Sequence, residues 1–140
     1  MMKTTAIFLA GTLSMMFSLS SYAEVSSRDA WIRLLPPGVK TTAAYLTLTS
    51  DVDDRLLAAS SPAATSIELH ESSMRDGMME MNHVGAIDLP AGKPVALEPG
   101  GLHMMVMGLN QPLVKGKDVV MTLTFEKAGE KTIRFTPKSP

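Results

Sequence analysis

Apolar and polar residues alternate with a period of two along most of this chain, and this pattern constrains the fold more than any other feature. It runs through Ala44–Leu48, Val119–Phe125 and Thr132–Thr136. Such alternation is typical of β-strands that have one face on a core. Because no stretch of ten or more residues shows helical periodicity, the sequence predicts an all-β chain.

Turn-forming residues interrupt the alternating runs at short intervals. Examples are Pro36-Pro37-Gly38, Arg75-Asp76-Gly77, Pro90-Ala91-Gly92, Pro99-Gly100-Gly101 and Lys115-Gly116-Lys117. Roughly eight or nine short strands separated by such turns predict a single-domain antiparallel β-sandwich or barrel with Greek-key connections. The chain contains no cysteine, so its core must provide stability without a disulfide. We expect Trp31, the only tryptophan, to fill part of that core.

The first residues have the features of a secretory signal peptide. Lys3 provides a positive charge, an uncharged apolar stretch follows, and Ser21-Tyr22-Ala23 offers small residues at the positions preferred before cleavage. The alternative, a membrane anchor of about 20 apolar residues, fits less well because serines interrupt the stretch. We therefore expect residues 1–23 to be removed on export and residues 24–140 to form the folded domain.

The charge of the chain argues against two classes of partner. Thirteen Lys and Arg residues and fourteen Asp and Glu residues give a formal net charge of −1, and no basic block is present. Nucleic acids and anionic membranes are therefore not expected partners. No later segment approaches the length of a transmembrane helix, so we expect no stable membrane insertion.

Methionine and histidine are concentrated in one region of the sequence. Seven of the twelve methionines lie between Met74 and Met107, together with His83 and His103 and close to His70. This density exceeds what irregular core packing normally needs. Methionine thioethers and histidine imidazoles in one region indicate a binding site for a soft metal ion.

Four of these residues form the candidate metal site: His70, Met81, His103 and Met105. Two imidazoles and two thioethers make a soft, neutral ligand set that suits Cu(I) better than zinc, iron or magnesium. A blue-copper electron-transfer site requires a cysteine thiolate, and a zinc hydrolase of the common helical type requires a His-Glu-x-x-His motif; the sequence contains neither. Neutral ligands favour moderate affinity and transfer of the metal, so the chain is expected to carry copper and to have no catalytic activity.

Strand geometry predicts how the four residues meet. His103 and Met105 are two positions apart on one predicted strand and share a face, whereas Met104 points to the core. The segment ending in His70 and the segment Met78–His83 are expected to form a hairpin that turns near Arg75–Gly77. A hairpin centred between Arg75 and Asp76 would place His70 opposite Met81, to within about one position.

The motif His-x10-Met-x21-His-x-Met resembles the signature of the periplasmic copper chaperones of the PCu(A)C family. The surrounding residues are also similar to that family at Leu69-His70-Glu71, Gly77–Met81, Pro99–Leu109 and Leu123–Gly129. The resemblance implies a cupredoxin-like fold, one Cu(I) per chain and a periplasmic location. It also implies a role in supplying copper to an acceptor protein, such as the dinuclear copper centre of a cytochrome oxidase subunit. We expect the chain to act as a monomer.

The remaining candidate residues are expected to have supporting roles. Met104 and Met121 should be core residues, Met107 should pack beneath the site, and His83 should be a surface residue with a possible auxiliary role. Residues expected to form an exposed apolar rim or to offset the charge of the metal are Met74, Met78, Met79, Glu71 and Glu80. Three other functions stay open: general copper buffering in the periplasm, a small exported copper enzyme, and a structural or adhesion protein that binds no copper.

Overall fold

The computed structural model describes residue 11 and residues 23–139. The predicted signal peptide therefore lies almost wholly outside the described residues. The described chain contains strands and turns but no helix. In particular, it offers no helix that is long and apolar enough to cross a membrane.

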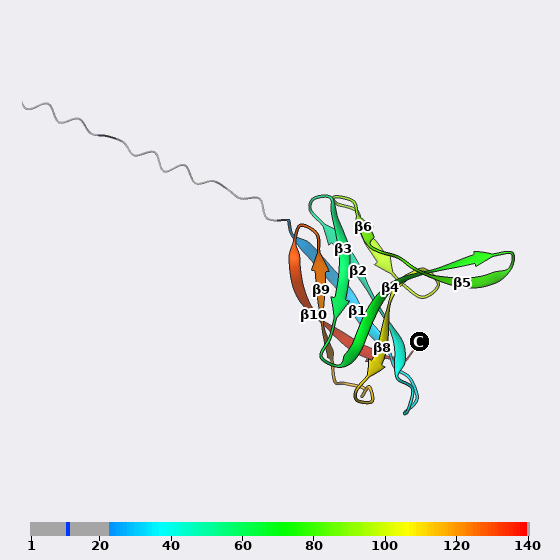
Figure 1. The fold of residues 1–140 in the computed structure, drawn as a ribbon. Helices are drawn as coiled ribbons and strands as arrows, with labels where there is room; N and C mark the ends of the chain where they lie inside the picture. Colours follow the sequence, from blue (N-terminus) through cyan, green and yellow to red (C-terminus); the bar gives the residue numbers. More distant parts are fainter. Residues whose placement is uncertain (1–10, 12–22, 140) are drawn as a thin grey trace, which may run out of the picture.

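Strands account for the regular structure of the described chain, as the period-two pattern predicted. They are β1 (Val25–Arg33), β2 (Thr41–Ser50), β3 (Asp54–Ser60), β4 (Ala64–Arg75), β5 (Met78–His83), β6 (Ile87–Leu89), β7 (Val95–Leu97), β8 (Leu102–Leu109), β9 (Val119–Phe125) and β10 (Gly129–Lys138). Figure 1 shows that most of them wrap around a common centre, while the hairpin of β4 and β5 extends to one side.

The sheet closes into a barrel. The strand order β4-β8-β2-β1-β10-β9-β3 returns to β4 through the pair Ala59↔Ile67. Three further strands lie outside this ring: β5 pairs with β4, β6 with β3 and β7 with β2. The expectation of an all-β, cupredoxin-like barrel is confirmed. One pair departs from the predicted antiparallel arrangement, because β1 and β10 run parallel.

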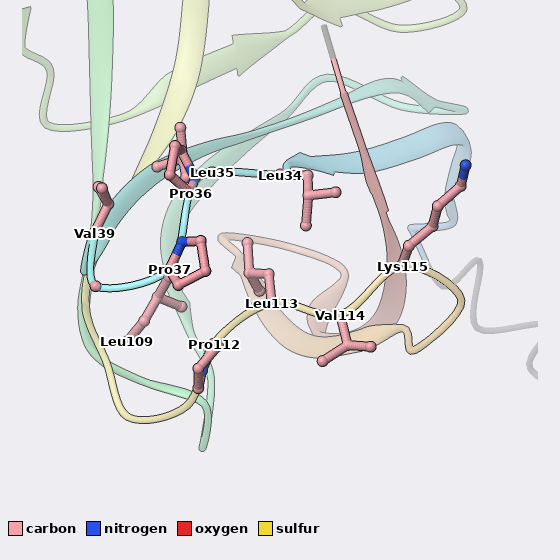
Figure 2. Close-up of a pocket in the computed structure, with 11 residues that line it drawn as sticks. Leu34, Leu35, Pro36, Pro37, Val39, Leu109, Pro112, Leu113, Val114 and Lys115 are labelled. Atoms are coloured by element: carbon pink, nitrogen blue, oxygen red, sulfur yellow. The ribbon is translucent and has the colours of Figure 1, made fainter.

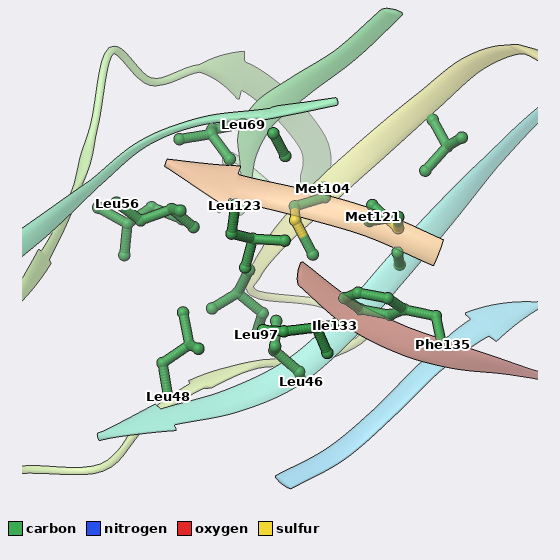
Figure 3. Close-up of a cluster of buried hydrophobic side chains, with 14 of the residues drawn as sticks. Leu46, Leu48, Leu56, Leu69, Leu97, Met104, Met121, Leu123, Ile133 and Phe135 are labelled. Carbon is green, nitrogen blue, oxygen red and sulfur yellow. The ribbon is translucent and has the colours of Figure 1, made fainter. Parts of the chain in front are cut away.

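The alternating apolar residues fill the inside of the barrel. Ala44, Leu46 and Leu48 of β2 are buried, as are Met121 and Leu123 of β9. Figure 3 shows these side chains meeting those of β8 and β10 from opposite walls. Since each strand contributes every second residue to this core, its other residues face outward and are free to build a site on the barrel wall.

The prediction that Trp31 fills the core is wrong. Its neighbour Ile32 is fully buried in the core, and Trp31 lies half-buried on the other face of β1. The ring of Trp31 packs on that of Tyr45, with 4.6 Å between the ring centroids. Trp31 and Ile32 are both apolar, so alternation alone does not decide which of two adjacent residues points inward.

Gly108, near the end of β8, occupies a position that excludes a side chain. Its φ of 68° is in the left-handed region, and a Cβ there would lie 2.4 Å from Oγ1 of Thr65. We expect Gly108→Ala to lower the free energy of unfolding by about 1–3 kcal/mol. Gly101→Ala is the control, because its Cβ would meet no atom closer than 3.7 Å. Chemical denaturation of both variants checks this; equal stabilities would contradict it.

Candidate metal centre

The candidate centre lies on the outer wall of the barrel, where β4, β8 and β2 run side by side. His70 of β4 is directly opposite His103 of β8 in the strand register. Residues that are opposite each other on adjacent strands point to the same face, and the two imidazole rings are stacked with centroids 5.9 Å apart. Although 33 positions apart in the chain, the two histidines are neighbours because β4 and β8 pair.

The hairpin register differs from the prediction by two residues. His70 is opposite His83, and Met81 is opposite Ser72. The turn consists of Asp76 and Gly77 alone, with φ angles of 52° and 76°, which is the two-residue turn that favours Asp-Gly. Because the shift is an even number of residues, Met81 still points to the same face of the hairpin as His70.

Each histidine has one ring nitrogen engaged and one free. Nδ1 of His103 lies 3.0 Å from the carbonyl oxygen of Gly101, and Nε2 of His70 lies 2.9 Å from a carboxylate oxygen of Glu68. Both oxygens can only accept, so these nitrogens carry the protons and donate. In the neutral imidazoles, Nε2 of His103 and Nδ1 of His70 then present lone pairs, and both atoms are buried without a hydrogen-bond partner among the described residues.

This pattern is the one that metal-binding histidines show. A metal-ligating imidazole usually donates its other ring nitrogen to a carboxylate or a backbone carbonyl, which fixes the ring and raises its basicity. Buried polar atoms are rarely left unpaired. The two free nitrogens, each on a ring held from the opposite side, therefore fit the role of metal ligands better than a purely structural role.

The two thioethers share a pocket with His103, whereas His70 is not one of the residues that line this pocket. Met81, His103 and Met105 together line a pocket of about 430 Å³ whose other walls include Tyr45 and Arg33. His103 is only 3% exposed, whereas Met81 is 56% exposed on the projecting hairpin. The structure thus brings all four predicted residues to one face, with a buried histidine at the base of the pocket and an exposed methionine at its edge.

Glu68 is a carboxylate in direct contact with a predicted ligand, His70. The sequence pointed to Glu71 and Glu80 for this role, but Glu71 alternates with His70 on β4, and Glu80 alternates with Met81 on β5. Both glutamates consequently face away from the candidate centre. Glu68 lies two residues before His70, and this i, i+2 spacing on a strand was the signal that could have identified it.

Aromatic residues form a second layer that the sequence did not indicate. Tyr45 of β2 is buried, and its ring centroid lies 6.4 Å from that of His103. Trp31 covers Tyr45 from the far side, and the guanidinium of Arg33 lies 5.8 Å from the Tyr45 ring centroid. Tyr45 thus lies between Trp31 and His103 on the barrel wall, and its ring is the aromatic neighbour of His103 on the β2 side.

The remaining histidine and methionines occupy different positions around the candidate centre. Met79 lines the same pocket as Met81. His83 is exposed, as expected for a surface residue, but its ring meets that of His70 edge-on at 5.6 Å between centroids. Met107 is half-buried and is not one of the pocket residues, and Met78 points to the opposite face of the hairpin.

Two observations limit where else a metal or ligand could bind. Within residues 23–139, no three His, Cys, Asp or Glu side chains gather in a way that could hold a metal ion, so the thioethers are needed to complete a ligand set. A separate pocket of about 320 Å³ lies between the loops that follow β1 and β8 (Figure 2). The residues lining that pocket are almost all apolar, and none is a histidine or methionine.

Comparison with known proteins agrees with this geometry. Residues 25–136 match the family described as putative lipoprotein LpqE-like. A curated relative, the putative lipoprotein Lxx21020 of Leifsonia xyli subsp. xyli (strain CTCB07), is 29% identical over 131 residues, which are 87% of this chain and 79% of the relative.

Solved structures with the same fold include copper-bound proteins. The copper-bound PCuAC domain from PmoF2 has a TM-score of 0.70 and 28% identity, covering 83% of this chain and 93% of that domain. The solution structure of CuI-DR1885 from Deinococcus radiodurans has a TM-score of 0.64 and 34% identity, covering 79% of this chain and 75% of that protein. The chain therefore belongs to the PCuAC family, to which the LpqE-like description also refers.

Proposed function

We propose that this chain is a periplasmic carrier that binds one Cu(I) and delivers it to an acceptor protein. The proposed ligands are Nδ1 of His70, Nε2 of His103 and the sulfur atoms of Met81 and Met105. The observation that carries the proposal is the pair of buried, unpartnered nitrogens on the adjacent rings of His70 and His103, the second of which shares a pocket with the two thioethers. Soft sulfur and imidazole ligands prefer Cu(I).

The ligand set suits transfer rather than storage. All four proposed ligands are neutral, so the bound ion keeps its positive charge and no thiolate holds it tightly. His103 belongs to the barrel wall and is buried, whereas Met81 lies on the exposed hairpin. Met81 can therefore leave the ion without disturbing the core, and an acceptor ligand can take its place.

The known relatives support the identity of the cargo metal, but they do not identify the acceptor protein. The solved relatives include copper-bound domains, which supports copper as the cargo. For the acceptor we propose the dinuclear copper centre of a cytochrome oxidase subunit. General copper buffering in the periplasm is the alternative. A small copper enzyme is less well supported, because the relatives named above are copper-binding domains of a chaperone type.

Export is part of the proposal. The sequence features of residues 1–23 fit a cleaved signal peptide, and the family and the curated relative are both described as lipoproteins, a class of exported proteins. In that case residues 24–140 work in the periplasm. Cysteine-free ligation suits this oxidising compartment, because thioethers do not form disulfides.

A transfer experiment tests the function. The Cu(I)-loaded protein is mixed anaerobically with the purified soluble copper domain of an oxidase subunit, and the two proteins are separated. One equivalent of a one-electron oxidant such as ferricyanide is then added to the acceptor, so that the visible absorption of its oxidised, mixed-valence dinuclear centre can be measured. We expect the centre to form, with copper leaving the carrier in stoichiometric amounts. Retention of copper on the carrier would reject delivery to this acceptor, and failure of the chain to bind Cu(I) at all would reject the function.

Removing the carboxylate that orients His70 should weaken copper binding. Loss of such an outer partner typically lowers metal affinity by about 10–100-fold, and because Glu68 is partly exposed we expect roughly tenfold for Glu68→Ala. Glu71→Ala is the matched control, since Glu71 is on the same strand but points to the other face. Anaerobic competition against a chromophoric Cu(I) chelator measures both. If both variants lost Cu(I) affinity equally, the loss would come from the removal of a negative charge and not from a change in the orientation of His70.

A further inference from the structure

The outer part of the β4–β5 hairpin extends beyond the barrel. The last pair that joins β4 to β8 in register is Glu71↔Leu102, and one further backbone hydrogen bond links Ser72 to Gly101. From residue 73 to residue 80 the two hairpin strands pair only with each other in the described chain. Figure 1 shows this segment projecting away from the other strands.

Methionines occupy this projecting segment although no core is there to receive them. Met74 is 67% exposed and Met79 is 62% exposed, and Met81 at the base of the segment is also exposed. Exposed apolar side chains gain nothing from the hydrophobic effect, so packing within this chain does not explain them. Their thioether sulfur atoms are the one chemical feature that other apolar side chains lack.

The strand register gathers three of these thioethers on one face. Met74 is directly opposite Met79, and their Cβ atoms are therefore about 4.5–5.5 Å apart. Met81 follows Met79 by two positions and points to the same side. Met79 and Met81 also line the pocket that contains His103 and Met105. The three sulfur atoms thus continue the ligand face of the candidate centre toward the tip of the hairpin.

Met78 provides a contrast within the same hairpin. It is as exposed as the other methionines, but it is opposite Arg75 and alternates with Met79, so it points to the other face. That face carries the polar and charged residues Ser73, Arg75 and Glu80. Only one face of the hairpin therefore combines several thioethers with direct continuity to the pocket.

We propose that Met74, Met79 and Met81 form a second, weaker Cu(I) site composed only of thioethers, through which copper enters and leaves the centre. Methionine has three rotatable side-chain bonds, so its sulfur can converge with others on a soft ion. Met81 belongs to both sites and connects them. This inference rests on the proposed Cu(I) carrier function, and it adds the position at which an incoming or outgoing ion is held.

The test isolates the thioether site by removing both imidazoles. Full-length His70→Ala/His103→Ala protein is titrated anaerobically with Cu(I) against a weak chromophoric competitor. We expect residual Cu(I) binding, which falls by at least about tenfold when Met74→Leu and Met79→Leu are added. Leucine has a similar volume but no sulfur. Adding Met78→Leu instead should leave the residual affinity unchanged.

A measurement on the unaltered protein covers the case in which the imidazole-free variant does not fold. Isotope-labelled methionine methyl groups are observed by NMR while a second equivalent of Cu(I) is added to the one-copper form. The signals of Met74 and Met79 should shift, and that of Met78 should not. No shift at Met74 and Met79, no residual binding in a folded imidazole-free variant, or equal losses with Met78→Leu would each overturn the proposal. If the unaltered protein failed to bind even a first equivalent of Cu(I) tightly, that result would instead reject the carrier function itself.

Discussion

Replacing His103 by alanine is expected to lower the affinity for Cu(I) by more than about 100-fold. The loss of an outer partner costs up to about 100-fold, and the loss of a ligand held at the base of the pocket should exceed that. His103 is suited to this anchoring role because Gly101 accepts the hydrogen bond from its Nδ1 and Tyr45 lies beside its ring. Anaerobic competition against a chromophoric Cu(I) chelator measures the change.

His83→Ala is the matched control for that experiment. His83 is also an imidazole near His70, but it is exposed and lies on the hairpin, away from His103. We expect its removal to change Cu(I) affinity by less than about threefold. If His83→Ala abolished binding and His103→Ala did not, the metal would lie between the hairpin strands, and the proposed ligand set would be wrong. Far-UV circular dichroism of both apo variants checks that the barrel is retained.

The all-β fold was predictable because the sequence pattern that produces it, an apolar residue at every second position, is repeated in several strands. In β2 and β9 every second residue is apolar, and the structure buries those residues. Barrel closure was less accessible from sequence, since it depends on a single short pairing between β3 and β4 and on the parallel contact between β1 and β10. No local pattern in the sequence specifies either of these long-range pairings.

The four candidate residues could be selected from the sequence, but the register of their hairpin could not. The spacing of histidine and methionine singled out four positions as candidate ligands, and the strand pairing brings those positions to one face. The hairpin register was wrong by two positions because the predicted hairpin was centred between Arg75 and Asp76, whereas the observed turn is centred one residue later, between Asp76 and Gly77. Glu68 and Tyr45 were missed because their importance depends on which strands are neighbours, and that information lies outside any single segment.

Adjacent residues of β8 should have opposite effects on stability and on copper binding. Met104 is fully buried in the core, whereas Met105 faces the pocket (Figure 3 shows Met104 among the core residues). Met104→Ala leaves a cavity, and we expect it to lower the free energy of unfolding of the apo protein by about 2–5 kcal/mol. Because the ligands remain in place, its Cu(I) affinity should stay close to that of the unaltered protein.

Met105→Ala should show the reverse behaviour, because it removes a proposed ligand from a half-buried position without emptying the core. Its apo stability should change by less than about 1 kcal/mol, while Cu(I) affinity falls by at least about tenfold. Paired chemical denaturation of the apo proteins and competitive Cu(I) titration measure both quantities. If Met105→Ala kept full affinity, the ligand set would have to be completed by another thioether, and Met79, which lines the same pocket, would be the first to examine. Copper binding that is weakened in both variants would mean that the site depends on the packing of the whole strand rather than on the sulfur of Met105.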